Sequence, residues 1–354
     1  MTANKTLNES KNLKKNEQSK FKIVYLFLMK SYTINTDELA KGIQNGDRVS
    51  LSRAITLAES TLKQHQQEAQ QLIQKVLPLT GKSKRIAITG VPGVGKSTFI
   101  ESFGNLLTQK GLKVAVLAID PSSTLSGGSI LGDKTRMEDL ARNPNAYIRP
   151  SANSGQLGGI ASRTYESLLL CEAAGFDVIL IETVGVGQSE TLVHTMTDLF
   201  LFLQIPGAGD ELQGIKRGIM EMSDLIFINK IDSFGLEKAQ EVKVTFARSL
   251  QFLPQKNSGW KRKVLMGSGF TGQGLEEVWQ KTEEYFKTIQ SNQYLEKRRE
   301  EQNKLRIKEY IKEQMTQVAL DLYKENTFSE TEIQSKNAYF LAEEWIKKHV
   351  KFNQ

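Results

Sequence analysis

A glycine-rich segment in the first third of the chain matches the pattern GxxxxGK[ST] without a mismatch; it consists of Gly90, Val91, Pro92, Gly93, Val94, Gly95, Lys96 and Ser97. It follows the apolar run IAIT and precedes a helical pattern that begins at Thr98, which is the context this motif requires. The glycines let backbone N–H groups turn inward around phosphate oxygens. Lys96 supplies a cation for the β- and γ-phosphates, and the Ser97 hydroxyl can ligate Mg²⁺. The N-terminus of the following helix adds a positive field. These residues, with Thr98, predict a nucleoside triphosphate site.

A second segment indicates which base is bound. The apolar run LIFI is followed by Asn229, Lys230, Ile231 and Asp232, the NKxD pattern that reads guanine in GTPases. A carboxylate such as that of Asp232 can accept two hydrogen bonds, from the N1–H and N2–H₂ groups of guanine, and adenine presents no such pair of donors. A site built for that pair rejects the wrong base because its polar groups would stay unpaired. The sequence therefore predicts GTP and GDP as the bound nucleotides.

A third segment follows the apolar run at 264–266 and consists of Ser268, Gly269 and Phe270. It lies where GTPases use an SA-type loop to brace the base, except that Gly269 stands where alanine is usual. We expect these residues to contact the guanine together with Asn229, Lys230 and Asp232. The departure at Gly269 leaves the exact bracing contact open.

Acidic residues at the ends of other apolar runs predict a magnesium site. Mg²⁺ prefers about six hard oxygen ligands and keeps several waters, and the candidate direct or water-mediated ligands are Ser97, Asp120, Asp133 and Glu182. Glu182 ends the run VILI, in the Walker B position, where small GTPases usually have aspartate. We expect the residues that act in hydrolysis to be Lys96, Glu182 and Gln188. Gln188 can orient the attacking water, although it can equally be a polar switch residue and no more.

The elements that position these residues form an alternating pattern. Short runs rich in Val, Ile and Leu, with little polar alternation, alternate with helical patterns from Arg85 onward; they span 86–89, 114–119, 178–181, 199–205, 225–228 and 264–266. Such runs are typical of strands buried on both faces of a parallel sheet. We therefore predict an α/β P-loop fold with a mostly parallel sheet flanked by helices, and expect the chemistry at the carboxyl ends of the strands.

Composition shifts divide the chain into four predicted regions: a basic, disordered extension over 1–30, an N-terminal helical segment over 31–80, a GTPase domain over 81–285 and a C-terminal helical region over 286–354. The 31–80 segment shows helical spacing for two or three helices. In the last region Ile311, Met315, Val318 and Leu322 form an apolar stripe. Ser329 and Glu332 are spaced as a capping box. We expect this tail to pack on the main domain or on a second copy of the chain.

Composition limits the remaining functions. The 354 residues carry a formal charge of +7, and residues 1–22 contribute six lysines against two glutamates. A short basic tail therefore supplies most of the excess, and it reads as a solvated arm, with an accessory contact to RNA or a membrane surface as the alternative. We do not expect nucleic acid as the main partner. One cysteine and three scattered histidines exclude a disulfide pair and disfavour a histidine-rich metal store.

The longest early apolar run, IVYLFLM at 23–29, is far shorter than the roughly 20 residues that a membrane span needs. It also lacks the small-residue cleavage site of a signal peptide, so we predict no transmembrane segment and a cytoplasmic location. Met29 opens a stretch that reads like a natural protein start. Residues 1–28 are therefore hypothesised to be an upstream extension of the reading frame or a dispensable arm, and the intact mass of the native protein tests this.

Six segments in fixed order resemble a known family: ITGVPGVGKST, LAIDPSS, GGSILGDKTRM, IETVGVGQSE, PGAGDELQGIKRGIMEMSD and NKID. They resemble the methylmalonyl-CoA mutase-associated GTPases of the MeaB/ArgK type, in the SIMIBI class of P-loop GTPases. The resemblance covers roughly residues 36–350. It implies slow GTP hydrolysis and a role as chaperone for an adenosylcobalamin-dependent acyl-CoA mutase, whose cofactor loading the GTPase gates and which it protects from inactivation.

The resemblance also implies homodimers formed through C-terminal helices, which suits the apolar stripe. Asp120, Asp133 and Glu182 correspond to magnesium and switch residues of the family. Residues 205–216 match a third switch loop that couples nucleotide state to the partner, with Asp210, Glu211 and Lys216 as the signalling residues. One rival function stays open within the same class, a metallochaperone GTPase for nickel insertion, which would require clustered His or Cys ligands.

Overall fold

A single seven-stranded sheet forms the centre of the molecule, and all of its neighbouring strands run parallel, in the order β3-β2-β4-β1-β5-β6-β7. The computed structural model describes residues 34–119, 137–150, 157–183, 189–207 and 217–350. The strands are β1 (Lys84–Gly90), β2 (Val114–Ile119), β3 (Ala146–Arg149), β4 (Val178–Thr183), β5 (Leu199–Gln204), β6 (Leu225–Ile228) and β7 (Lys263–Met266). The predicted parallel α/β fold is confirmed, and the six predicted runs are all strands. Strand β3 was missing from the prediction.

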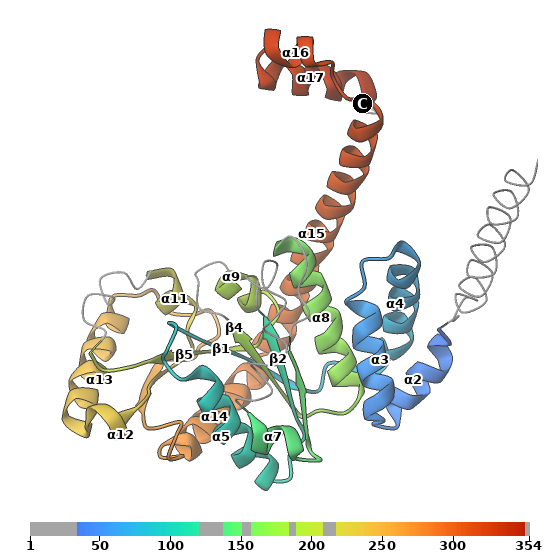
Figure 1. Cartoon of the computed structure of the whole chain (residues 1–354). Coiled ribbons are helices and arrows are strands. Elements are labelled where there is room, and N and C mark those ends of the chain that lie inside the picture. The colour runs from blue at the N-terminus through green and yellow to red at the C-terminus, as the bar shows by residue number, and fades with distance from the viewer. Residues whose placement is uncertain (1–33, 120–136, 151–156, 184–188, 208–216, 351–354) are drawn as a thin grey trace, which may run out of the picture.

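Helices cover both faces of this sheet (Figure 1). Those of the described chain are α2 (Thr36–Gln44), α3 (Arg48–Ala58), α4 (Lys63–Val76), the 3-10 turn η1 (Leu77–Leu79), α5 (Lys96–Gln109), α7 (Glu138–Arg142), α8 (Leu157–Ala173), α9 (Ser189–His194), α11 (Arg217–Met222), α12 (Ile231–Phe234), α13 (Leu236–Gln251), α14 (Leu275–Ser291), α15 (Tyr294–Glu325), α16 (Glu330–Ser335) and α17 (Ala338–His349). None of the helices in the described ranges is both long and apolar enough to cross a membrane.

Successive residues of each strand point to opposite faces of the sheet, so two separate cores form. Ile86 and Ile88 of β1 lie in a core that includes residues of α5, α7 and α14. Ala87, between them, lies in the opposite core with residues of α3, α4 and α8. A third cluster lies under α12 and α13 at the β6 end. Burial on both faces explains why the strands read as continuous apolar runs.

The N-terminal segment forms three helices, and each of the first two begins at a residue whose side chain caps it. The side chain of Asn35 accepts hydrogen bonds from the backbone N–H groups of Asp37 and Glu38 in α2. The side chain of Asp47 likewise accepts hydrogen bonds from backbone N–H groups in the first turn of α3. Ile55 and Leu72 are fully buried in the core over the sheet. These helices are therefore one layer of the sheet's packing rather than an independent unit.

The C-terminal helices form an arm that stands away from the sheet (Figure 1). Helix α15 runs unbroken over 32 residues. The predicted capping box is present at the start of α16, where Ser329 and Glu332 bond each other's backbone. Trp345 of α17 stacks edge-on against Tyr323 of α15, which fixes the end of the arm. The predicted boundary at 285/286 falls inside α14, which stays in the core as far as Ile289.

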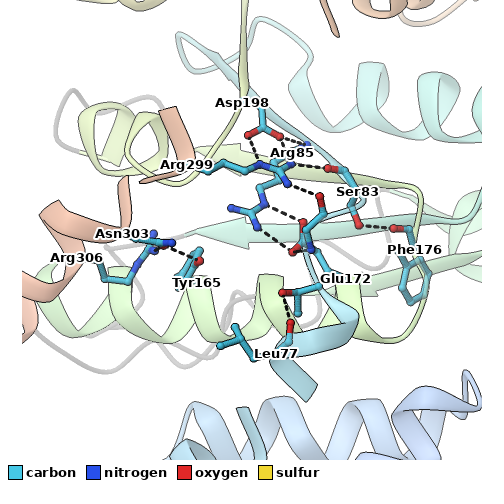
Figure 2. Close-up of polar contacts among 12 residues, drawn as sticks. Leu77, Ser83, Arg85, Tyr165, Glu172, Phe176, Asp198, Arg299, Asn303 and Arg306 are labelled. Carbon is cyan, nitrogen blue, oxygen red and sulfur yellow. Dashed lines mark hydrogen bonds and ion pairs between the residues drawn. The ribbon is translucent and has the colours of Figure 1, made fainter. Parts of the chain in front are cut away.

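The arm is held to the sheet at the amino ends of β1 and β5, as Figure 2 shows. Arg299 of α15 donates to both carboxylate oxygens of Asp198, at 3.0 and 2.7 Å, and to the carbonyl oxygen of Ser83 at 2.8 Å. Arg85 donates to both carboxylate oxygens of Glu172, at 2.9 and 2.8 Å. The Arg85 backbone N–H also donates to Asp198. Two buried carboxylates and two guanidinium groups thus form ion pairs at the amino ends of these strands.

Candidate nucleotide site

The phosphate loop leaves β1 at Gly90 and enters α5 at Lys96. Gly93 and Gly95 adopt left-handed backbone conformations, with φ of 78° and 90°, which is the freedom that the glycine-rich pattern predicts. The Lys96 ammonium donates to the carbonyl oxygens of Gly90 at 2.9 Å and Val91 at 3.3 Å. It is therefore folded over the loop, where it can meet phosphate oxygens.

The pKa of Lys96 is lowered by burial, and two carboxylates, Glu182 and Glu190, oppose this shift. Glu182 was predicted here; Glu190 was not. Glu190 lies in the first turn of α9 and is 2% exposed. The signal that could have found it is an acidic residue directly after the loop that follows Glu182. The two carboxylates therefore favour the charged form of Lys96, against the effect of burial.

Ser97 and Glu182 come together at the carboxyl ends of β1 and β4. The Ser97 hydroxyl donates to Glu182 Oε1 at 3.1 Å. The adjacent ends of these strands are tied by a buried hydrogen bond of 2.8 Å between the hydroxyls of Thr89 and Thr183. Two oxygen donors facing each other beside a phosphate loop fit the ligand preference of Mg²⁺. When bound, that ion would neutralise charge on the phosphates.

Six further predicted residues lie outside the described part of the chain, namely Asp120, Asp133, Gln188, Asp210, Glu211 and Lys216. Among the residues that the structure describes, no group of three or more His, Cys, Asp or Glu side chains is arranged to hold a metal ion. Of the predicted magnesium set, the structure therefore brings together Ser97 and Glu182.

The base-reading residues join the phosphate loop through Asn229. Its side-chain amide donates to the Val94 carbonyl at 2.9 Å, and its side-chain oxygen accepts from the Gly269 N–H at 2.7 Å. Lys230, in a left-handed conformation with φ of 60°, reaches the Gly93 carbonyl at 2.7 Å. Segments about 40 and 135 residues away from Asn229 thus meet on one side chain.

Asp232 is exposed at the mouth of the site. Its pKa is lowered by hydrogen bonds from the hydroxyls of Ser268 and Ser233, in that order of size. Ser268 is fully buried and accepts from the N–H groups of Phe270 and Thr271. The carboxylate is therefore ionised and oriented, as an acceptor for two base N–H donors must be. Phe270 is 79% exposed beside it.

The space beside Gly269 leaves no room for a side chain. A Cβ built there would lie 2.9 Å from the Cα of Phe99 and 3.1 Å from its N, both backbone atoms of α5. Alanine, which is usual in such loops, would overlap the helix. The base loop thus lies close against α5 at Gly269, and the Gly269 N–H bonds Asn229 there.

A parallel sheet with a phosphate loop after β1 and a guanine-reading segment after β6 defines a P-loop GTPase. The model of the family described as "Methylmalonyl Co-A mutase-associated GTPase MeaB" matches residues 51–323. The chain belongs to this family.

Individual proteins that are similar to this chain support the same family assignment. The chain is 55% identical over 246 residues to a "Putative GTPase" of Caulobacter vibrioides, covering 70% of this chain and 75% of that protein. It is 47% identical over 273 residues to "GTPase ArgK" of Escherichia coli, covering 76% and 82%. It is 45% identical over 287 residues to the "Methylmalonic aciduria type A homolog, mitochondrial" of Mus musculus, covering 78% and 69%. A solved structure named "LAO/AO transport system kinase" superposes with a TM-score of 0.70 at 34% identity, covering 88% of this chain and 98% of that one.

Proposed function

We propose that this GTPase serves as a chaperone for an adenosylcobalamin-dependent acyl-CoA mutase, with methylmalonyl-CoA mutase as the first candidate, and that it works in the cytoplasm. GTP binding and hydrolysis would gate loading of the mutase's cofactor and protect the mutase from inactivation. The family to which the chain belongs is described as associated with methylmalonyl-CoA mutase, which supports this partner. The observation that carries the proposal is that Asn229 joins the phosphate loop, at Val94, to the proposed base loop, at Gly269. A nucleotide-driven chaperone needs such a connection between the two parts of its nucleotide site.

Hydrolysis at this site is proposed to need little chemistry from the protein beyond positioning and charge. Lys96 would hold the β- and γ-phosphates, and Ser97 and Glu182 would hold Mg²⁺ together with Asp120 and Asp133. Gln188 would orient the attacking water. An incomplete set of such groups gives slow turnover in the isolated protein, and a partner that completes the set raises it.

The link to the partner is proposed to run through Asp210, Glu211 and Lys216, just before α11. The arm is proposed to form the homodimer. Its stripe residues Met315 and Val318 are 61% and 63% exposed, and a second copy of the arm would bury them. Burial of such apolar surface is the main favourable contribution to association.

The experiment measures GTP hydrolysis by the pure protein with and without methylmalonyl-CoA mutase from the same cell. The expected result is stimulation by the mutase that the Lys96→Ala variant loses. A Lys→Ala change at exposed Lys304, far from the site, is the matched control and should keep the stimulation. A hydrolysis rate that does not change when the mutase is added would contradict this choice of partner. Other cobalamin-dependent mutases would then be tested in the same way. Hydrolysis that persists in Lys96→Ala would point to a contaminating enzyme.

A further inference from the structure

We propose that Gly269 is a positioning residue for GTP: its missing side chain sets the distance between the guanine subsite and the phosphate loop. The inference rests on the GTP site itself and is independent of the mutase partner. It concerns a buried residue that donates one hydrogen bond within the site and otherwise acts through the space it leaves open.

The contact at Gly269 is between two backbones. The nearest atoms to a Cβ at this position would be the Cα, Cβ and N of Phe99, at 2.9, 3.1 and 3.1 Å. Phe99 lies in the first turn of α5, where its N–H bonds the Gly95 carbonyl of the phosphate loop at 2.9 Å. The Cα and N are backbone atoms and the Cβ is attached directly to the backbone, so no rotamer change can relieve the overlap. Either the helix or the base loop must move.

Helix α5 is the side that stays in place. Phe99 is fully buried, and its ring packs against Phe103 at 5.4 Å and edge-on against Phe227 of β6 at 5.2 Å between centroids. The first turn of α5 is therefore anchored to the sheet from inside. A close-packed core of this kind resists displacement, so an added methyl group pushes the base loop outward.

The base loop moves as one body. Its ends are joined by hydrogen bonds from the Ser268 N–H to the Gln273 carbonyl at 2.9 Å and from the Gly272 N–H to the Ser268 carbonyl at 3.0 Å. Phe270 and Thr271 donate to the Ser268 hydroxyl oxygen, and that hydroxyl also bonds the Asp232 carboxylate. A shift at Gly269 therefore moves the bracing residues and loosens the group that orients Asp232.

One nucleotide must satisfy the guanine subsite and the phosphate loop at the same time. The two subsites meet at Asn229, which bonds Val94 on one side and Gly269 on the other. If their spacing changes, the base and the phosphates cannot both reach their partners. Binding weakens, whereas Lys96, Ser97 and Glu182 keep their places around the phosphates.

The test is the Gly269→Ala variant of the full chain, assayed for GDP binding by calorimetry and for GTP hydrolysis. We expect the Kd for GDP and the KM for GTP to rise about tenfold, which is less than the roughly 10²-fold that a misplacement of about 1 Å can cost, with kcat within about twofold. Gly269→Ser adds the same Cβ and should show the same split. The variants are expected to fold, because overpacking at one position costs about 1–3 kcal/mol.

The matched control is Gly104→Ala, in the second half of α5. A Cβ there would meet the Leu140 side chain at 2.6 Å, so it disturbs packing away from the nucleotide. It should lower the melting temperature and leave the Kd for GDP unchanged. The proposal is overturned if both Gly269 variants bind GDP as the wild type does, or if kcat falls while KM stays constant.

Discussion

Charged groups are held differently at the amino ends of the strands, here called the amino edge of the sheet, and at their carboxyl ends, the carboxyl edge. At the amino edge, Asp198 and Asp224 precede β5 and β6, and each carboxylate accepts the N–H of a residue at the start of a neighbouring strand. Each is fully buried and paired with a cation, Arg299 or Lys256. At the carboxyl edge, the polar groups of Lys96 and Asn229 bond backbone carbonyls of the phosphate loop.

This difference between the two edges shows where the protein holds a charged group that a ligand can reach. Pairs at the amino edge are internal and complete, so they stabilise the fold and anchor the arm. At the carboxyl edge a lysine bonded to neutral carbonyls can exchange them for phosphate oxygens, which are stronger acceptors for a cation. Stability and function are thus separated along one set of strands, and substitutions at the two edges should separate them too.

The largest effect is expected for Asp198→Ala at the amino edge. The change leaves the Arg299 side chain, which is 15% exposed, without its carboxylate and the Arg85 N–H without its acceptor. Removing one partner of a buried pair costs up to about 3–5 kcal/mol. Urea unfolding of the nucleotide-free protein measures the loss. The Asp198→Asn variant, which keeps an acceptor, should lose less. If GDP affinity of the folded variant also falls, the two edges are not independent.

Lys96→Ala at the carboxyl edge should give the reverse result. The rate of GTP hydrolysis should fall about 10²–10³-fold, which is the cost of removing one group that stabilises developing charge. The free energy of unfolding without nucleotide should change by about 1 kcal/mol, because the hydrogen bonds that Lys96 makes within the described chain go to neutral carbonyls of its own loop. Steady-state kinetics and urea unfolding of the same sample check both parts. A large loss of stability would contradict the comparison.

Asp232→Asn sharpens the comparison within the carboxyl edge. Guanine would lose the acceptor for its two N–H donors, and we expect GTP affinity to fall about 10²-fold. Xanthine presents a carbonyl oxygen where guanine has its amine, and an amide N–H can donate to it, so xanthosine triphosphate should bind the variant better than GTP. Competition binding with the two nucleotides measures this. Asp232→Ala, the control, should lose GTP without gaining xanthosine triphosphate.

The smallest effect concerns Glu166, on α8 near the root of the arm. Burial raises the pKa of this carboxyl to about 7; Glu313 adds to the shift, and Arg163 and Arg306 oppose it. The folded protein then holds a proton that the unfolded chain releases near pH 4.5, so stability should decrease as pH rises from about 4.5 to 7. Melting temperatures at pH 5 and 8 should differ less in Glu166→Gln than in the wild type. An equal difference in both proteins would contradict this assignment.

Much of the fold follows from local patterns. The apolar runs correctly predicted a parallel sheet, and the spacing of Ser329 and Glu332 correctly predicted the start of a helix. Strand β3 was missed because its sequence, AYIR, contains a single residue of the Val, Ile and Leu types, and so carries little apolar pattern. The predicted boundary at 285/286 lies within α14, whose buried residues continue as far as Ile289.

The sequence by itself determined the residue types of the site: the phosphate loop, the NKxD segment with Asp232, and the apolar runs of the strands are each encoded within a few neighbouring residues. The tertiary structure alone decided which distant residues meet. Arg299 finds Asp198 across 101 positions, and Gly269 abuts Phe99. Such contacts depend on strand order and helix packing, which no local window contains. Local residue types fix what a site can do, and long-range packing fixes how its parts are spaced.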